Sequence, residues 1–295
     1  MTARSRQRDR QTRPGRRGSR LFLFLAVVAV VAGVTVAVWR GTGPLPDPPG
    51  CTATVAGRTV HLQPDQAENA SLIAAIGVRR GLPARAVSIA LATAYQESKI
   101  RNLGHGDRDS LGIFQQRPSQ GWGTAKQIRD EYYAINKFYD ALEKIDGYQT
   151  MRITEAAQKV QRSGFPEAYE AHAPDARALA SALTGYSPDG TFTCVAAAPD
   201  GHGTAASATA TLTKAYGDLD IARTGSRQDF TVRVAAGRDG NRKGWSIAGH
   251  LLAHADRLKV TAVSFDGKVW RSGDDSENGW VRTSASSTTV TVSLG

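Results

Sequence analysis

The chain has 295 residues, with 37 lysines and arginines against 27 aspartates and glutamates, which gives a formal net charge of +10. Residues 1–20 hold eight arginines and one aspartate, a net +7, which leaves +3 for the other residues. Charge therefore gives no reason to expect nucleic acid as a partner of the folded part. The length predicts one or two domains once non-globular segments are set aside.

The apolar run 21–39 contains nineteen apolar or small residues and no charge. A helix of about 20 such residues spans a bilayer, so the run predicts a single transmembrane anchor. The arginine-rich tail 1–20 before it predicts a cytoplasmic N-terminus, with the main domains outside the cell membrane. A cleaved signal peptide is the rival interpretation; the run is long for one, and no small-x-small site follows closely. Residues 40–50, rich in proline and glycine, predict a stiff stalk.

Residues 51–194 show mostly helical periodicity, apart from segments 52–55 and 59–62, which predict a short hairpin. We expect a mainly α protein with a compact all-α domain over this range. The expected helices are 67–80, one that begins near Pro83 and ends at Ser98, 125–145, one capped by Thr154, and one that opens at Phe165-Pro166, is broken at Pro174 and ends near Thr184.

The helix that ends at Ser98 is almost wholly apolar but has Glu97 in its last turn. The residues behind Glu97 on the same face are small, namely Ala86, Ala90, Thr93 and Ala94, so that another backbone can approach and exclude water. Exclusion of water and the negative end of the helix dipole both favour a neutral carboxyl group, which general acid catalysis requires. The alternative is a glutamate that points into solvent.

The composition changes after residue 194. Residues 195–208 are small and flexible and predict a linker. Residues 209–295 predict a small α+β domain with a strand at 229–235, a helix at 245–258, a hairpin at 260–270 around Asp266-Gly267, and a strand at 288–293. We expect this domain to bind the cell wall or a protein partner.

The two cysteines, Cys51 and Cys194, lie at the two ends of the helical domain. Outside the membrane a disulfide between them would persist, and it would close a loop of more than a hundred residues. Two unrelated thiols are the alternative. Two cysteines do not make a zinc site of the usual kind, so we expect no metal and no cofactor.

The stretch from Glu97 onward resembles a known pattern. Glu97-Ser98, a Gly/Asp-rich loop and the run Leu111–Pro118 (LGIFQQRP) resemble the Glu-Ser … Gly-Leu-Met-Gln … Pro pattern of soluble lytic transglycosylases. These enzymes belong to the lysozyme-like superfamily together with goose-type lysozymes. The segment 156–163 (AAQKVQRS) stands where that family has Ala-Tyr-Asn-Ala-Gly. The resemblance covers about residues 66–185.

This resemblance implies an enzyme that cleaves the β-1,4 bond between N-acetylmuramic acid and N-acetylglucosamine in peptidoglycan. Glu97 matches the catalytic acid/base, and Gln115 matches a glutamine that lines the cleft. In a lytic transglycosylase the same glutamate accepts a proton from the sugar's own 6-hydroxyl, so that no second carboxylate is needed. As further substrate-binding residues we expect Ser98, Gln116, Trp122 and Gln161. For Trp122, stacking on a sugar and packing in the core are both open.

Two departures from the family pattern leave alternatives open. The family tyrosine has no match, because Val160 or Gln161 stands in its place. This favours the alternative of a peptidoglycan-binding or wall-morphogenesis protein without turnover. Asp107 and Asp109 are candidates for a second carboxylate that would direct a water and give hydrolysis. Ordinary turn chemistry in the loop is the alternative for both aspartates, and we favour it.

Histidines and tryptophans in the C-terminal part give weaker signals. His250 and His254 are four residues apart, a spacing that can place two metal ligands side by side on a helix. No third ligand is evident, and we interpret them as histidines of the polar face. Trp245, Trp270 and Trp280 either form a glycan-binding platform or pack in the core, and we expect core packing for at least two of them.

Overall fold

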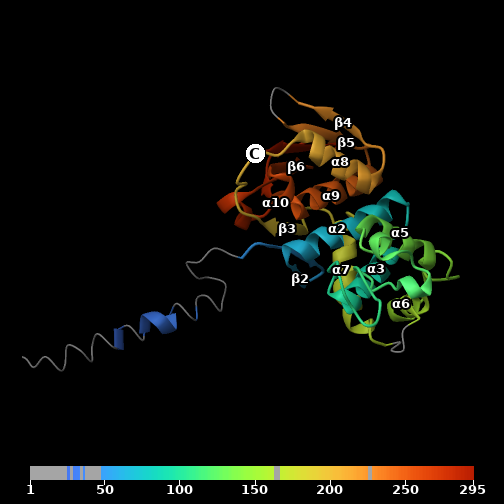
Figure 1. The fold of residues 1–295 in the computed structure, drawn as a ribbon. Helices are drawn as coiled ribbons and strands as arrows, with labels where there is room; N and C mark the ends of the chain where they lie inside the picture. The colour runs from blue at the N-terminus through green and yellow to red at the C-terminus, as the bar shows by residue number, and fades with distance from the viewer. Residues whose placement is uncertain (1–24, 27–28, 34–35, 37–47, 163–166, 225–227) are drawn as a thin grey trace, which may run out of the picture. The chain divides into compact units, whose positions relative to one another are not determined.

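The computed structural model describes residues 25–26, 29–33, 36, 48–162, 167–224 and 228–295 (Figure 1). The chain divides into two compact units, 1–47 and 48–295. The expected basic tail 1–20, stalk residues 40–47 and much of the expected anchor 21–39 lie outside the described residues. Those that are described in the first unit, 25–26, 29–33 and 36, are helical and exposed.

The predicted transmembrane anchor is wrong for the part of the chain that the structure describes. No helix among these residues combines the length and the apolar character that a bilayer crossing requires.

The first half of the second unit consists of helices around a small sheet. Its elements, in chain order, are β1 (Gly50–Val55), β2 (Arg58–Leu62), α2 (Pro64–Arg79), α3 (Ala84–Ser98), η1 (Pro118–Gln120), α4 (Ala125–Ile128), α5 (Glu131–Leu142), α6 (Ile153–Gln161), η2 (Glu170–His172), α7 (Ala173–Leu183) and β3 (Phe192–Val195).

The second half adds a larger sheet with helices. Its elements are α8 (Ala205–Tyr216), β4 (Asp220–Arg223), β5 (Phe230–Arg233), α9 (Arg238–Ala253), α10 (Ala255–Leu258), β6 (Val260–Phe265), β7 (Lys268–Arg271), η3 (Gly273–Asn278), β8 (Val281–Arg282) and β9 (Thr289–Leu294). Helix α8 begins at Ala205, inside the segment 195–208 whose composition predicts a linker.

The expected mainly α fold class is wrong, because the described residues form two antiparallel sheets among the helices. The smaller sheet has the order β2-β1-β3, and the larger has the order β4-β5-β9-β6-β7-β8. Region 51–194 is therefore not all-α. The predicted hairpin is present as β1 and β2, but the sequence analysis missed β3, a strand of four residues that pairs with β1.

The predicted disulfide between Cys51 and Cys194 is confirmed. The two residues lie directly opposite each other in the register of β1 and β3. Their 143-residue separation means that the bond ties the start of the helical region to its end.

Helix α3 lies at the centre of the helical region, as its apolar sequence predicts. Its residues from Ala86 to Ala94 are all buried. Because alanine dominates this helix, neighbouring backbones approach closely, and α3 contacts α2, α5, α6 and α7. A helix buried on all sides holds a residue in its last turn in a fixed position.

Two expected helix boundaries need correction. The helix predicted over 125–145 is interrupted because Asp130 caps the second piece, α5, by accepting a hydrogen bond from Tyr133 N at 3.0 Å. Pro174 does not break a helix but stands in the first turn of α7, where proline lacks only a bond that the helix would not make.

Helix α2 joins the two halves of the unit. It contacts α3, α5 and α7 on one side and α8 and α9 on the other, and Figure 1 shows it between these groups. Buried apolar residues form one continuous core from Cys51 to Val292. The indole nitrogens of Trp270 and Trp280 donate to Cys194 O at 2.8 Å and to Phe192 O at 2.9 Å. The two halves are therefore packed as one body.

Candidate active site

Helix α3 ends just after Glu97 because Lys99 and Ile100 leave the helical conformation. Both residues have positive φ angles, 55° and 59°, which is unusual for a β-branched residue such as Ile100. Two side chains of α2 hold this turn: Gln66 Nε2 donates to Lys99 O and Asn69 Nδ2 donates to Ile100 O, each at 2.8 Å. The position of Glu97 is thus fixed by α2 as well as by its own helix.

Glu97 accepts a hydrogen bond from the hydroxyl of Tyr169, with 2.7 Å between the hydroxyl oxygen and Oε1. Tyr169 is buried, with 1% of its surface exposed, whereas Glu97 is half-buried. Glu97 forms no ion pair with a described lysine, arginine or histidine. One carboxyl oxygen is therefore oriented by a neutral donor, and the group keeps a side that solvent reaches.

The neighbouring residues of the last turn form a polar aromatic wall. The ring of His172 stacks on Tyr95 with 5.1 Å between centroids, and its Nε2 lies 3.0 Å from Gln96 Oε1. Burial lowers the pKa of His172, so the ring is neutral at pH 7 and its Nε2–H donates to Gln96. At pH 7 this wall therefore places no positive charge beside Glu97.

Ser98 connects the end of α3 to the segment 111–116. Its hydroxyl donates to Ile113 O at 2.7 Å, and its Oγ accepts from Arg101 N at 3.1 Å. The side chain is buried. Ser98, expected to bind substrate, instead positions the backbone of the segment that carries Gln115.

Gln115 stands in a tight turn that the bridge between Leu111 and Gln116 closes. Its φ angle is 47°, and its Nε2 donates to Gly112 O at 3.2 Å and to His105 O at 3.4 Å. A Cβ at Gly106 would collide with Gln115 Oε1. The glycine-rich loop therefore packs directly on the Gln115 side chain, which stays half-buried.

Gln116 lies in the interior, away from any substrate that approaches from solvent. It is 2% exposed and its Nε2 donates to Ala134 O at 3.2 Å. Its Oε1 has no hydrogen-bond partner among the described residues. The arrangement assigns Gln116 to the junction between the segment 111–116 and α5.

The two loop aspartates occupy different environments. Asp109 accepts hydrogen bonds from Ser119 N at 2.8 Å, from Arg117 Nε at 2.7 Å and from Ser119 Oγ at 3.0 Å. These bonds, that of the Ser119 amide above all, hold the pKa of Asp109 well below its usual range. Asp107 has 93% of its side chain exposed. Asp109 is engaged in loop structure, whereas Asp107 is exposed and lies 3.9 Å from Arg108 Nε.

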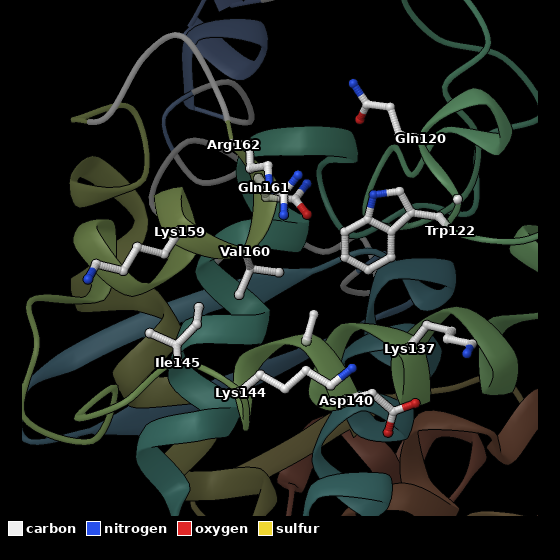
Figure 2. Close-up of a pocket in the computed structure, with 12 residues that line it drawn as sticks. Gln120, Trp122, Lys137, Asp140, Lys144, Ile145, Lys159, Val160, Gln161 and Arg162 are labelled. Carbon is white, nitrogen blue, oxygen red and sulfur yellow. The ribbon is translucent and has the colours of Figure 1, made fainter.

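Trp122 and Gln161 meet at the rim of a pocket of about 660 Å³ (Figure 2). Gln161 also donates to Phe114 O at 2.8 Å, next to Gln115. Both side chains are half-buried. The pocket is not lined by Glu97, and its lining residues are Gln120, Gly121, Trp122, Lys137, Asp140, Ala141, Lys144, Ile145, Lys159, Val160, Gln161 and Arg162.

Tyr169 and the basic residues of this pocket were not expected from the sequence. Tyr169 follows the segment 156–163 by six residues, and only the fold brings it to Glu97. In the helix predicted over 125–145, the spacing of seven would place Lys137 and Lys144 on one face, but α5 ends at Leu142 and Lys144 lies beyond it. No signal linked them to Arg162, which lies at the end of α6.

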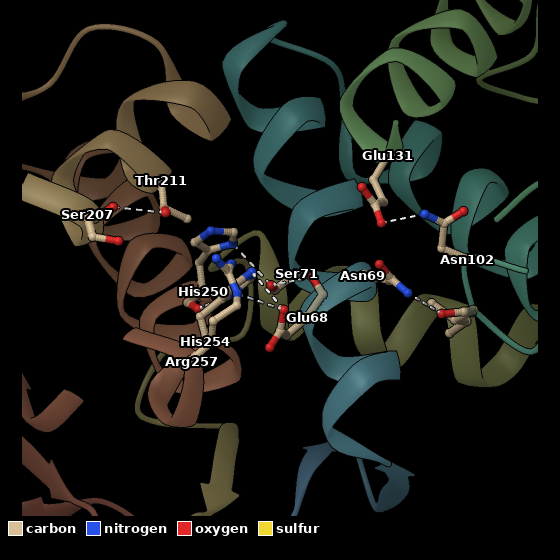
Figure 3. Close-up of polar contacts among 11 residues, drawn as sticks. Glu68, Asn69, Ser71, Asn102, Glu131, Ser207, Thr211, His250, His254 and Arg257 are labelled. Carbon is tan, nitrogen blue, oxygen red and sulfur yellow. Dashed lines mark hydrogen bonds and ion pairs between the residues drawn. The ribbon is translucent and has the colours of Figure 1, made fainter. Parts of the chain in front are cut away.

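A second group of titratable side chains lies between α2 and the C-terminal helices (Figure 3). The interpretation of His250 and His254 as polar-face residues is wrong, since both are buried. His250 Nδ1 lies 3.1 Å from Ser71 Oγ, and Arg257 Nε donates to Glu68 Oε2 at 3.1 Å. Burial lowers the pKa of His250 to about 3 and raises that of Glu68.

The expected core packing is confirmed for Trp245 and Trp270, which are buried. Trp280 is partly buried against the same core. The three indoles therefore do not form an exposed platform. Within the described ranges, no group of three histidine, cysteine, aspartate or glutamate side chains is arranged to hold a metal ion.

No protein-family model matches the chain, and the search of curated proteins gives no match either.

Proposed function

We propose that the protein cleaves the glycan strands of peptidoglycan at the β-1,4 bond after N-acetylmuramic acid, with Glu97 as general acid and then base. The observation that carries the proposal is the environment of Glu97. It is the acidic residue of an otherwise apolar, central helix, it is half-buried, and a buried tyrosine hydroxyl orients one of its oxygens at 2.7 Å.

The chemistry of glycoside cleavage needs this kind of group. A proton donor must reach the glycosidic oxygen from a fixed position, and the same carboxylate must later accept a proton. The Tyr169 bond occupies Oε1, so Oε2 remains for the sugar. No described cation pairs with Glu97.

The arrangement favours the lytic transglycosylase route over hydrolysis. A hydrolase of the usual kind needs a second carboxylate to direct water or to act as nucleophile. Asp109 is held by Arg117 and Ser119, which leaves only the exposed Asp107 in this loop. Attack by the 6-hydroxyl of the same sugar needs no second carboxylate, and this chemistry agrees with the side chains around Glu97.

The test compares the wild-type protein with Glu97→Gln and with the control Glu155→Gln. Glutamine keeps the size of the side chain and still accepts the Tyr169 bond, but does not donate an acidic proton. Glu155 lies exposed in the first turn of α6. We expect wild type and the control to release soluble fragments from purified sacculi and Glu97→Gln to release none. Equal release by all three proteins would end the proposal.

A wall-binding protein without turnover is the second candidate. The observation in its favour is that the large pocket beside Trp122 is not lined by Glu97. On this account the wild type binds sacculi in a sedimentation assay but releases no fragments. A role of residues 209–295 in recruiting a protein partner is separated from wall binding by comparing capture from membrane extracts with capture on sacculi.

We propose that the unit 48–295 works outside the cytoplasm. The Cys51–Cys194 bond supports this, because disulfides persist in oxidising compartments. Peptidoglycan, the proposed substrate, is found in the same compartment.

A further inference from the structure

The pocket beside Trp122 is strongly basic. Four cationic side chains line it, Lys137, Lys144, Lys159 and Arg162, against a single carboxylate, Asp140. Asp140 accepts a bond from Arg80 at 2.8 Å, and Arg80 also pairs with Glu143. The pocket therefore carries a net positive charge that no described side chain within it balances.

Two of the four cations are the best placed to meet a ligand. Lys137 is directed to the ring of Tyr133, with its Nζ 5.6 Å from the centroid. The end of Lys159 points away from Trp122 in Figure 2. Arg162 lies beside Gln161 on one side of the pocket and Lys144 on the opposite side, and Trp122 also lines the pocket. Neither forms an ion pair with a described carboxylate.

Hydrogen bonds connect this pocket to the proposed catalytic residue. Gln161, in the pocket wall, donates to Phe114 O. Ser98, next to Glu97, donates to the carbonyl of Ile113, the residue before Phe114. The backbone of Ile113 and Phe114 therefore connects the pocket wall to the end of α3 that carries Glu97.

We propose that this pocket binds the carboxylates of the peptide attached to muramic acid, next to the bond that is cut. The inference rests on the proposed function. The peptide is joined to the sugar through a lactyl group and carries free carboxylates, which Lys144 and Arg162 attract. The guanidinium group of Arg162 can bind a carboxylate with two parallel bonds. A volume of about 660 Å³ accepts several peptide residues, with Trp122 as the apolar wall.

The experiment measures binding in the Glu97→Gln background, so that strands stay intact whether or not the wild type is an enzyme. The test variant adds Lys144→Glu and Arg162→Glu. The control adds Arg223→Glu and Arg238→Glu, two exposed cations of the C-terminal half, which changes the net charge equally. The ligands are sacculi, glycan strands freed of peptides by an amidase, and sacculi freed of phosphate-rich polymers.

We expect the test variant to bind peptide-bearing strands about tenfold more weakly than the control does, because two contacts of exposed charges are lost. Peptide-free strands bind equally to both proteins, and the difference shrinks as salt rises. Unchanged affinity in the test variant, or equal weakening on peptide-free strands, overturns the proposal. A loss that disappears when phosphate polymers are removed assigns the pocket to phosphate and also overturns it.

The neutral pair Lys144→Gln and Arg162→Gln guards against a folding defect caused by the added acids. This variant should also bind peptide-bearing strands more weakly and peptide-free strands equally well, with a smaller loss of affinity and an unchanged melting temperature. If release of fragments fails in the wild type but the binding pattern holds, the proposed function fails while the peptide pocket stands.

Discussion

Tyr169 and Glu97 are 72 residues apart in the sequence, and a 2.7 Å hydrogen bond joins their side chains. The tyrosine belongs to the loop between α6 and η2 and is buried, whereas the glutamate ends the central helix α3. Because the hydroxyl is a neutral donor, it orients the carboxyl group without adding a cation beside it.

Replacing Tyr169 by phenylalanine removes the donor and keeps the ring. We expect kcat on sacculi to fall about tenfold to a hundredfold, because an unoriented carboxyl spends less time in the productive geometry. The free energy of unfolding should fall by only about 1 kcal/mol, the typical net value of one hydrogen bond. Steady-state kinetics and urea denaturation measure the two effects. A variant with full activity would remove Tyr169 from the mechanism.

The pair of cysteines offers a test of stability. Replacing Cys51 and Cys194 by serine should lower the free energy of unfolding by about 2–5 kcal/mol, because the bond closes a long loop in the unfolded chain. Urea denaturation measures the change, and the wild type under a reducing agent should match the double variant. If the denaturation midpoint were the same with and without the disulfide, the bond would not stabilise the fold, and β3 would be held by its other contacts alone.

Buried His250 predicts a loss of stability in acid. Burial lowers its pKa to about 3, below the value near 6.5 that it has in the unfolded chain. Between these values the unfolded chain binds more protons, so the stability is complete above pH 6.5 and declines as the pH falls toward 3. At pH 4.5 the protonation of this single group should lower the free energy of unfolding by about 2–3 kcal/mol relative to pH 7.

The measurement is the unfolding free energy at pH 7 and at pH 4.5 for the wild type and for His250→Gln. His254, whose pKa burial also lowers, contributes in the same direction in both proteins. The variant should show a clearly smaller difference between the two pH values. Equal differences would mean that His250 does not stay neutral in the fold.

Two glycines of α9 form a matched pair for a packing test. A Cβ at Gly244 would collide with the ring of Phe265, whereas one at Gly249 would meet Phe192 at an ordinary 3.5 Å. Gly244→Ala should therefore destabilise the protein by about 1–3 kcal/mol. Gly249→Ala should be neutral or stabilise it by up to about 1 kcal/mol, since alanine favours the helix. Thermal unfolding of both variants decides whether α9 packs on β6 as described.

Local patterns predicted several parts of the fold. The alanine-rich run 86–94 identified the buried central helix, and Asp266-Gly267 identified the turn of the β6–β7 hairpin, where both φ angles are positive. Strand β3 escaped because four residues carry too little periodicity, and its identity depends on pairing with β1 far along the chain. The fold class was wrong for the same reason, since pairing between distant strands leaves little mark on a single segment.

Only those residues of the candidate site could be predicted whose chemical group is unusual at their position in the sequence. Glu97 stands out because a charge at the end of an apolar helix is costly and rare. Gln116 and Ser98 matched a motif but serve the backbone around it, which no spacing reveals. Tertiary structure alone brings Tyr169 to Glu97 and Arg162 to the pocket beside Trp122.

The central claim is that Glu97 cleaves glycan strands by the lytic transglycosylase route, and mass spectrometry of the ends formed on purified sacculi tests it most directly. Our account predicts new 1,6-anhydromuramic acid ends with the wild type and none with Glu97→Gln at equal protein concentration. The same new ends from both proteins, or none from the wild type, would contradict it.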